Sequence, residues 1–396
     1  MGRGGEANFG RMENLNLIKQ AYKIARAALS NCLTNQGIIC GRHHFVDLWA
    51  RDSLFATFGA NVSGLSKHSK TTLSSFLDQQ RDDGLIPYCL LRAPTTISKY
   101  LGRPVFFPKL KPSFRQRPLA GLVLDGGLLT VLATWEYVNR TQDFNFAQKH
   151  YSQLKKALTW YIGRSHNHLL RDWFLCEWAD AVLKVGKTLY TNVLYWKALE
   201  DMSGLAKLLN NKADAEKFSR LSADVKEWVN REFWKENYFS DWIDYKRHHY
   251  FYSHGNMLAC WSGLADSAQS KQILKFADKF CWHDFTLEEN YPKYPWARIP
   301  FWNHLVGMGD YHNRGCLWLQ PGILYSLVLK KYGQKKKSMV VLRAISNQIV
   351  KHQGVYEIYE KDGQPVSRRF YQAETPFAWS AGMFIYAYHK LIQEKN

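Results

Sequence analysis

The chain has 396 residues, of which 46% are apolar and 15% aromatic, and its formal charge is +19. This apolar content excludes a disordered chain. We expect no membrane span, because no apolar run reaches about 18 residues, and no secretory leader, because the first residues, MGRGGEANFGRMENLN, lack an apolar core.

Apolar residues recur at spacings of three and four along most of the chain, which predicts one helix after another. The predicted helices are 13–33, 49–62, 66–79, 122–138, 145–163, 188–206, 212–231, 254–264, 268–280, 317–332, 335–351 and 376–392. Segments 123–138 and 317–332 are apolar nearly all round, whereas 214–234 has one polar face. Buried helices that alternate with amphipathic ones indicate two helical layers.

Long aromatic loops separate the helical pairs, at 80–121, 164–187, 232–253 and 281–316. Loops of this length in a compact domain are usually functional. A rim of such loops around one mouth favours an all-α toroid of six helical hairpins, an (α/α)6 fold. The alternative is an α-solenoid of helical pairs, which the lack of a constant sequence period disfavours.

Near the C-terminus, 354–371 is predicted to form a short β-hairpin around the turn Asp362-Gly363. We found no linker rich in proline, serine or glycine in the middle of the chain. The prediction is therefore a flexible N-terminus, 1–13, followed by a single catalytic domain, 14–396.

The seven cysteines are scattered and never form a CxxC pair, which favours free thiols in a reducing cytoplasm. The histidines lack metal-ligand spacing, and the common phosphate-binding glycine motifs are absent, so we expect neither a metal nor a cofactor. Basic residues are spread along the chain without a nucleic-acid motif, so a solvated basic surface is favoured over a nucleic-acid partner.

Four segments combine carboxylates with aromatic neighbours. Arg51 and Asp52 begin one predicted helix, where they suit either a helix cap or a clamp for sugar hydroxyls. In DWFLCEWAD (172–180), the tryptophans and Phe174 favour a protonated Asp180 or Glu177, as a general acid requires.

The two remaining carboxylates lie near the C-terminus. Glu357 alternates with Val355 and Tyr359 on the predicted strand, so that face suits a pocket wall. Glu374 precedes the last helix, where an acidic residue also suits the helix dipole. Two separated carboxylates in aromatic surroundings are typical of glycosidic bond cleavage.

The order of these segments resembles that of the helical-toroid glycoside hydrolases: glucoamylases, the glucosidase domain of glycogen debranching enzymes and, more distantly, trehalases and alkaline/neutral invertases. WARDSLFATFGA (49–60), EWADAVLKVGKTLYTNVLYWKALEDM (177–202) and GVYEIYEKDGQPVSRRFYQAETPFAWSAG (354–382) are similar to segments of that group. GDYHNRGCLWLQPG (309–322) looks like its His-Asn-Gly-Gly-x-Trp-Pro segment, with Arg314 and Leu319 as departures.

This resemblance implies an inverting glycosidase for α-linked glucosides in which Asp180 is the general acid and Glu357 the general base. Glu177 and Glu374 are their rivals. A sucrose- or trehalose-hydrolysing relative and a non-catalytic carbohydrate-binding scaffold are the alternative functions. The expected partner is an oligosaccharide or disaccharide, and the sequence does not indicate an oligomeric state. The expected substrate-binding residues are Trp49, Arg51, Asp52, Asp125, Glu177, Trp178, Lys187, His312, Asn313, Trp318, Glu374 and Trp379.

Overall fold

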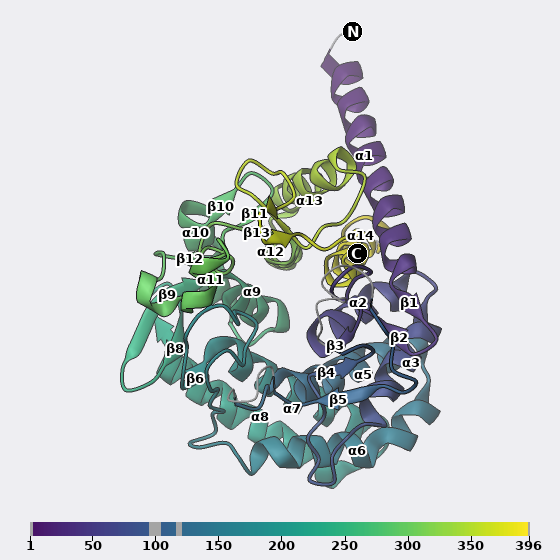
Figure 1. Ribbon diagram of the computed structural model, residues 1–396, viewed down its shortest axis with the longest axis vertical. Coiled ribbons are helices and arrows are strands. Elements are labelled where there is room, and N and C mark those ends of the chain that lie inside the picture. Colours follow the sequence, from purple (N-terminus) through teal and green to yellow (C-terminus); the bar gives the residue numbers. More distant parts are fainter. Residues whose placement is uncertain (1–2, 95–103, 116–120, 395–396) are drawn as a thin grey trace.

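The computed structural model describes residues 3–94, 104–115 and 121–394. Parts of the expected loop 80–121 therefore lie outside the described residues, as do the chain's first two and last two positions. The fold is an (α/α)6 toroid, as predicted, with twelve helices of ten or more residues among the described residues (Figure 1).

Six helices form an inner ring in which each packs against the next and the last closes onto the first. In chain order they are α2 (Ala50–Val62), α5 (Asp125–Thr141), α7 (Leu189–Leu208), α9 (Ser253–Ser262), α12 (Leu319–Lys331) and α14 (Ala378–Tyr388). They are apolar nearly all round because both of their faces are covered. In α14, for example, all residues are buried.

Six amphipathic helices surround this ring. They are α1 (Arg3–Asn31), α3 (Ser66–Leu77), α6 (Phe144–Ile162), α8 (Lys212–Phe233), α10 (Ser267–Phe280) and α13 (Lys335–Lys351). Helix α10 shows the pattern, since Ile273, Leu274 and Ala277 face the core, and its start is fixed by a capping box between Asp266 and Gln269. The predicted alternation of buried and amphipathic helices is confirmed.

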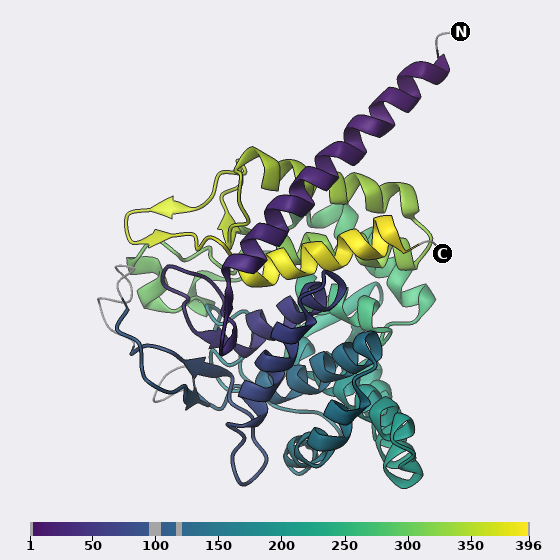
Figure 2. The ribbon, with the colours of Figure 1, turned by 90° about the vertical axis from the view of Figure 1, so that its right-hand side faces the viewer.

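The N-terminal segment is helical from Arg3, and α1 extends beyond the rest of the molecule (Figure 2). The flexibility expected of 1–13 stays a prediction. At the ring closure, α2 and α14 approach so closely that a Cβ on Gly59 would lie 2.0 Å from the Gly382 carbonyl oxygen. Two facing glycines therefore let these two backbones touch.

Short strands and loops gather on one face of the toroid, at the left in Figure 2. The inner helices begin at these segments: Trp49, Thr188 and Trp318, for example, are extended residues that cap α2, α7 and α12. The described strands are β1 (Leu33–Thr34), β2 (Gly37–Ile38), β3 (Leu48–Trp49), β4 (Cys89–Leu91), β5 (Lys111–Ser113), β6 (Lys187–Thr188), β7 (Trp234–Lys235), β8 (Tyr238–Ile243), β9 (Arg247–Tyr252), β10 (Trp282–His283), β11 (Thr286–Leu287), β12 (Asn290–Tyr291), β13 (Leu317–Trp318), β14 (Ile358–Tyr359), β15 (Ser367–Arg368) and β16 (Tyr371–Gln372).

One expected loop is instead a sheet. Residues 232–253 contain the antiparallel strands β8 and β9, which pair with β6 and β12 in a five-stranded sheet that also includes β7. The loop prediction was wrong here because the run 238–252 is rich in aromatic residues, which favour strands, and the bend at 244–246 folds it back as a hairpin. The expected C-terminal turn is present, since Gly363 has φ +78° and its N–H donates to the Glu360 carbonyl.

Candidate active site

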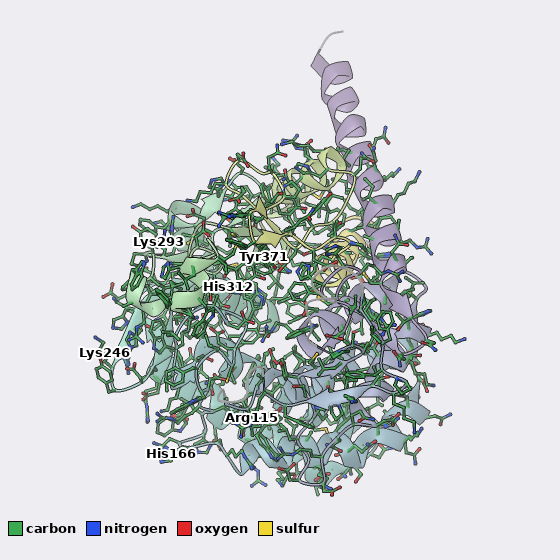
Figure 3. All side chains as sticks on the ribbon, in the orientation of Figure 1. Arg115, His166, Lys246, Lys293, His312 and Tyr371 are labelled. Carbon is green, nitrogen blue, oxygen red and sulfur yellow. The ribbon has the colours of Figure 1, made fainter. Side chains whose placement is uncertain are left out.

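The inner helices begin around a cleft of about 460 Å³ on the loop-bearing face. It is lined by Cys40, Phe45, Trp49, Arg51, Asp52, Trp178, Asp180, Trp302, Asn303, Val306, Met308, Tyr311, His312, Trp318, Glu357, Tyr371, Phe377 and Trp379. All four carboxylate-bearing segments thus contribute to one cleft. Figure 3 shows two of its residues, His312 and Tyr371, near the centre of the toroid.

Glu357 is buried in the cleft wall and surrounded by hydrogen-bond donors. The Tyr311 hydroxyl donates to Oε1 at 2.5 Å, the Tyr371 hydroxyl lies 2.7 and 2.8 Å from the two oxygens, and the Glu374 N–H donates to Oε2 at 3.1 Å. Burial raises the pKa of Glu357 to about 7, although the two tyrosine hydroxyls oppose this rise. The group therefore titrates near neutral pH.

Asp180 reaches the cleft from the other candidate catalytic segment, 172–180. Its Oδ1 lies 3.6 Å from His312 Nε2, and His312 Nδ1 lies 2.9 Å from the buried Glu289. Burial disfavours the charge on His312, but Glu289 and Asp180 outweigh it and raise the pKa of His312 to about 9. The His312 imidazole, placed between the carboxyl groups of Glu289 and Asp180, holds Asp180 in position.

The aromatic surroundings expected for Asp180 are only partly present. Trp178 is buried and stands edge-on to Trp318 and Trp379, so these three indoles form the floor of the cleft. Trp173 and Phe174, by contrast, are exposed by 50% and 41% and do not line the cleft. The sequence places them near Asp180, but the loop turns their side chains outward.

The Arg51 guanidinium is held in place by a buried carboxylate, that of Asp125. Its Nε and Nη2 lie 2.7 and 2.6 Å from Asp125 Oδ2, and Tyr190 donates to the same oxygen at 3.4 Å. Burial raises the pKa of Asp52 to about 6, against the charge of Arg51. Arg51, Asp52 and Trp49 face the cleft, and Asp125 lines a small adjoining cavity with Arg51 and Asp180.

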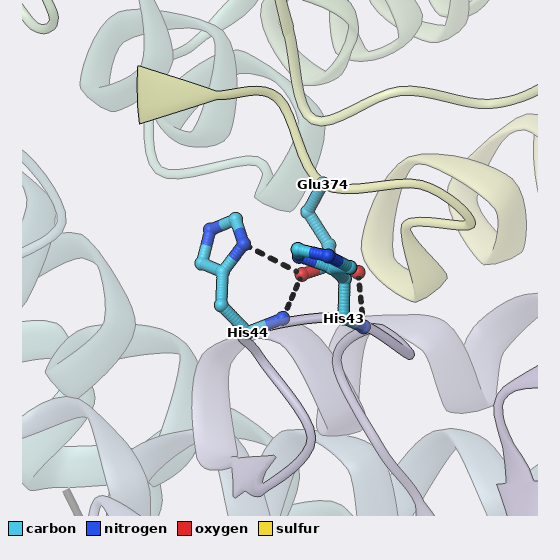
Figure 4. Close-up of side chains that lie close together, drawn as sticks. All are labelled: His43, His44 and Glu374. Atoms are coloured by element: carbon cyan, nitrogen blue, oxygen red, sulfur yellow. Dashed lines mark hydrogen bonds and ion pairs between the residues drawn. The ribbon is translucent and has the colours of Figure 1, made fainter. Parts of the chain in front are cut away.

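Glu374 lies outside the cleft, and its oxygens are already occupied. Oε1 accepts the N–H groups of Arg42 and His43, and Oε2 those of His44 and Phe45, at 2.7–3.0 Å. Figure 4 shows the contacts from His43 and His44, including His44 Nδ1 at 3.2 Å from Oε2. His43, His44 and Glu374 lie close enough to hold a metal ion, but four N–H donors point at the carboxylate lone pairs that a cation would need.

Besides Glu374 and Asp125, three expected residues do not line the cleft. Glu177 is buried against Lys184 at 2.6 Å, and Lys184 also contacts Asp241 at 2.9 Å. Asn313 accepts the Tyr294 N–H at 2.7 Å and orders the neighbouring loop. Lys187 lies in β6, opposite Ile243 of β8. The partners of Glu177 and Asn313 are thus protein groups outside the cleft lining.

Sequence reasoning missed Tyr311, Tyr371 and Glu289, which complete the polar environment of the two candidate catalytic groups. The first two stand inside segments that had been singled out, beside His312 and two residues before Ala373-Glu374. Their role depends on side-chain direction, which no spacing reveals. Glu289 follows another acidic residue in a loop, and only its contact with His312 distinguishes it.

The arrangement suits acid–base chemistry on one bound ring. The carboxyl groups of Asp180 and Glu357 reach the same cleft, whose floor is indole. Such apolar floors pack against the C–H faces of sugars, while carboxylates and Arg51 suit hydroxyls.

Comparisons with known proteins agree with this reading. The family model of the bacterial α-L-rhamnosidase six-hairpin glycosidase domain matches residues 49–287. No curated protein sequence matches the chain.

Solved structures share the fold at low sequence identity. A mannosylglycerate hydrolase from Thermus thermophilus is similar at 14% identity and a TM-score of 0.67, covering 92% of this chain and 99% of that one. A rhamnosidase from Bacillus sp. GL1 is similar at 18% identity and a TM-score of 0.69, and the match covers 95% of this chain and 35% of that one. A rhamnosidase from Klebsiella oxytoca is similar at 13% identity and a TM-score of 0.68, and the match covers 96% of this chain and 64% of that one. With the family match spanning more than half of its length, the chain belongs to the six-hairpin toroid glycosidases, in the family of the bacterial α-L-rhamnosidase domain.

Proposed function

We propose that this glycoside hydrolase cleaves an α-linked glycoside with inversion, using Asp180 as general acid and Glu357 as general base. The observation that carries the proposal is that both groups line the same indole-floored cleft. A non-catalytic scaffold would not require two carboxyl groups from distant segments to meet there.

In this mechanism, Asp180 donates its proton to the glycosidic oxygen as the bond between that oxygen and the anomeric carbon breaks. Glu357 takes a proton from a water molecule, whose oxygen bonds to the anomeric carbon from the opposite face. Inversion requires room for that water, so we expect the two carboxyl groups to lie about 6.5–9.5 Å apart. By donating hydrogen bonds, Tyr311 and Tyr371 favour the ionised form of Glu357, which a general base requires.

Two sugars are candidates for the cleaved unit. The names of the matching family and of two structural neighbours favour an α-L-rhamnoside. The resemblance to debranching enzymes and glucoamylases favours an α-D-glucoside, with sucrose and trehalose as related substrates. Seven cysteines without a disulfide among them support a reducing compartment such as the cytoplasm.

The test is a panel of methyl and aryl α-L-rhamnosides and α-D-glucosides, together with isomaltose, panose, sucrose, trehalose and mannosylglycerate. NMR of the first product should show the inverted, β anomer. Asp180→Asn and Glu357→Gln should each lower kcat by at least about 10²–10⁴-fold, whereas Asp284→Asn, at an exposed carboxylate, should not.

For Glu357→Ala, azide should restore turnover by replacing water and give a β-glycosyl azide. Retention of the α anomer would contradict the inverting mechanism. Full activity of both carboxylate variants on every cleaved substrate would refute the assignment of the two roles.

A further inference from the structure

Large apolar side chains are exposed together at one side of the cleft. They belong to residues 296–310, here called the rim arch, which contains the 3₁₀ turn Trp296–Arg298 and the short helix α11 (Phe301–Leu305). Trp296, Phe301 and Leu305 are 62–65% exposed, and Trp302 and Val306 are 42% and 40% exposed. Contiguous exposed apolar surface of this kind commonly marks a binding site.

The rim arch is attached to both catalytic segments. At its start, the Leu183 N–H donates to the Arg298 carbonyl at 2.7 Å, and Arg298 donates back to the Leu183 carbonyl at 3.1 Å, three residues after Asp180. At its end, Arg368 donates to the Gly307 carbonyl at 2.8 Å and pairs with Asp310 at 2.6 Å. The arch therefore runs between the acid loop and the C-terminal segment that carries Glu357.

The arch is also continuous with the cleft, because Trp302, Asn303 and Val306 are lining residues. In the proposed mechanism the acid protonates the oxygen that joins the sugar to its leaving group. The leaving group consequently lies on the Asp180 side and extends towards the mouth. The rim arch spans the mouth between the two catalytic segments and is hydrogen-bonded to the loop after Asp180, so a leaving group that extends in this direction meets its exposed apolar side chains.

Polar groups are unevenly distributed between the two ends of the cleft. The end bounded by Arg51, Asp52 and Glu357 offers charged groups and tyrosine hydroxyls for a sugar ring. The arch offers the amide of Asn303, while His304 is stacked on Trp296 with ring centroids 4.4 Å apart. A second sugar placed against the arch would find few hydrogen-bond partners there, whereas a flat apolar group would cover the exposed rings and gain more from apolar contact.

We propose that the rim arch is the binding surface for the leaving group and that it selects a flat, apolar leaving group, such as a fused aromatic ring, over a second sugar. This inference rests on the proposed function, because it takes its direction from the role of Asp180. Stacking on Trp302 and contact with Phe301 and Leu305 provide the selectivity.

The test compares kcat/KM for the phenyl and 2-naphthyl glycosides of both candidate sugars. Phenol and 2-naphthol have similar acidity. The ratio of the two kcat/KM values therefore reports on contact area rather than on leaving-group chemistry. The wild-type enzyme should prefer the naphthyl compound. Trp302→Ala and the double variant Phe301→Ala/Leu305→Ala should each lower the naphthyl-to-phenyl ratio by about tenfold, mainly through KM. The matched control is Tyr245→Ala, which removes an 84% exposed ring in the β8–β9 turn and should leave both the ratio and the rates unchanged.

The outcomes distinguish a failure of the leaving-group role from a failure of the proposed glycosidase function. Hydrolysis of neither glycoside pair by the wild-type enzyme would count against the proposed function itself. Activity with a ratio near one, or arch variants that keep the wild-type ratio, would overturn the leaving-group role while leaving the glycosidase intact. Sedimentation of the wild type and the variants tests whether a second copy of the chain covers the arch instead. A wild-type dimer that dissociates in the arch variants, with an unchanged naphthyl-to-phenyl ratio, would assign the arch to that second copy and overturn the leaving-group role.

Discussion

Two glutamates only 17 positions apart in the chain have opposite surroundings. Glu357 faces the cleft and accepts from two tyrosine hydroxyls, whereas Glu374 accepts four backbone N–H groups from the loop 42–45. Hydroxyls can be rearranged when a group changes its charge, but backbone N–H groups cannot turn away. The first environment therefore suits a titrating base and the second an anchor for a loop.

The pH dependence of activity should reveal Glu357. A general base works when ionised, so kcat/KM should fall as the pH drops through about 7, the value to which burial raises the pKa of Glu357. Tyr371→Phe removes a donor that favours the ionised form, so that pKa should rise further. We expect the acidic limb of the pH profile to move up by about one unit.

The control for this shift is Tyr332→Phe, at a tyrosine that does not line the cleft and whose hydroxyl contacts two carbonyls at 3.4 Å. If the acidic limb of the pH profile does not move in Tyr371→Phe, a group other than Glu357 determines the pH at which activity falls.

Glu374→Gln should act on stability more than on chemistry. Its amide would point N–H groups at backbone N–H groups of residues 42–45 and leave about two buried donors unpaired, which costs about 2–5 kcal/mol. Urea unfolding should show this loss. Glu357→Gln should lose less, because the Tyr311 and Tyr371 hydroxyls can turn and accept. A Glu374→Gln protein with wild-type stability but no activity would transfer the base role to Glu374.

At the scale of elements, the toroid is formed by inner helices that are covered on both faces and outer helices that are covered on one. The inner helices also begin at the cleft, so residues near their N-terminal ends, such as Trp49, Arg51 and Trp379, converge there. The fold thereby collects into one site residues that are more than 300 positions apart.

The contact of α2 with α14 closes the ring and tolerates no added methyl group. In Gly382→Ala the new Cβ would lie 2.6 Å from the Ala56 Cα, so the helices must separate. Overpacking of this kind costs about 1–3 kcal/mol, measurable by urea unfolding. Gly163→Ala is the matched control, since its Cβ would meet the Thr159 carbonyl oxygen at 3.5 Å with φ −66°. Equal stability of the two variants would contradict the close packing.

At the scale of the whole molecule, the thiols are buried and none of the seven cysteines forms a disulfide. Burial raises the pKa values of Cys176, Cys260 and Cys281 to about 12. The native protein should therefore react slowly with a thiol reagent at neutral pH, whereas the denatured protein should reveal seven thiols without added reductant. Five or fewer would indicate a disulfide.

The charge of +19 and the apolar helices are also properties of the whole molecule. No helix among the described residues is long and apolar enough to cross a bilayer. The expectation that the basic surface does not bind nucleic acid stays a prediction. Binding to duplex DNA should be weak and lost at moderate salt; tight binding with a steep salt dependence would contradict it.

The sequence by itself determined the twelve main helices and the alternation of inner with outer ones. Inner helices are covered by protein on both faces and are apolar nearly all round, whereas outer helices are covered on one face and carry one apolar face. Carboxylates and a guanidinium set among aromatic residues also marked Arg51, Asp180 and Glu357 as candidates, with Glu177 and Glu374 as rivals, and the family resemblance favoured Asp180 and Glu357. The strands β8 and β9 were not predicted, since the run 238–252 was assigned to a loop.

Only the tertiary structure decided which carboxylates reach the cleft. Glu177 and Glu374 have sequence surroundings as suggestive as those of Asp180 and Glu357, yet one pairs with Lys184 and the other with backbone N–H groups. The same holds for Tyr371, whose hydroxyl meets Glu357 only after a turn of the chain. Spacing along a loop does not set the direction of a side chain; packing against segments distant in sequence does.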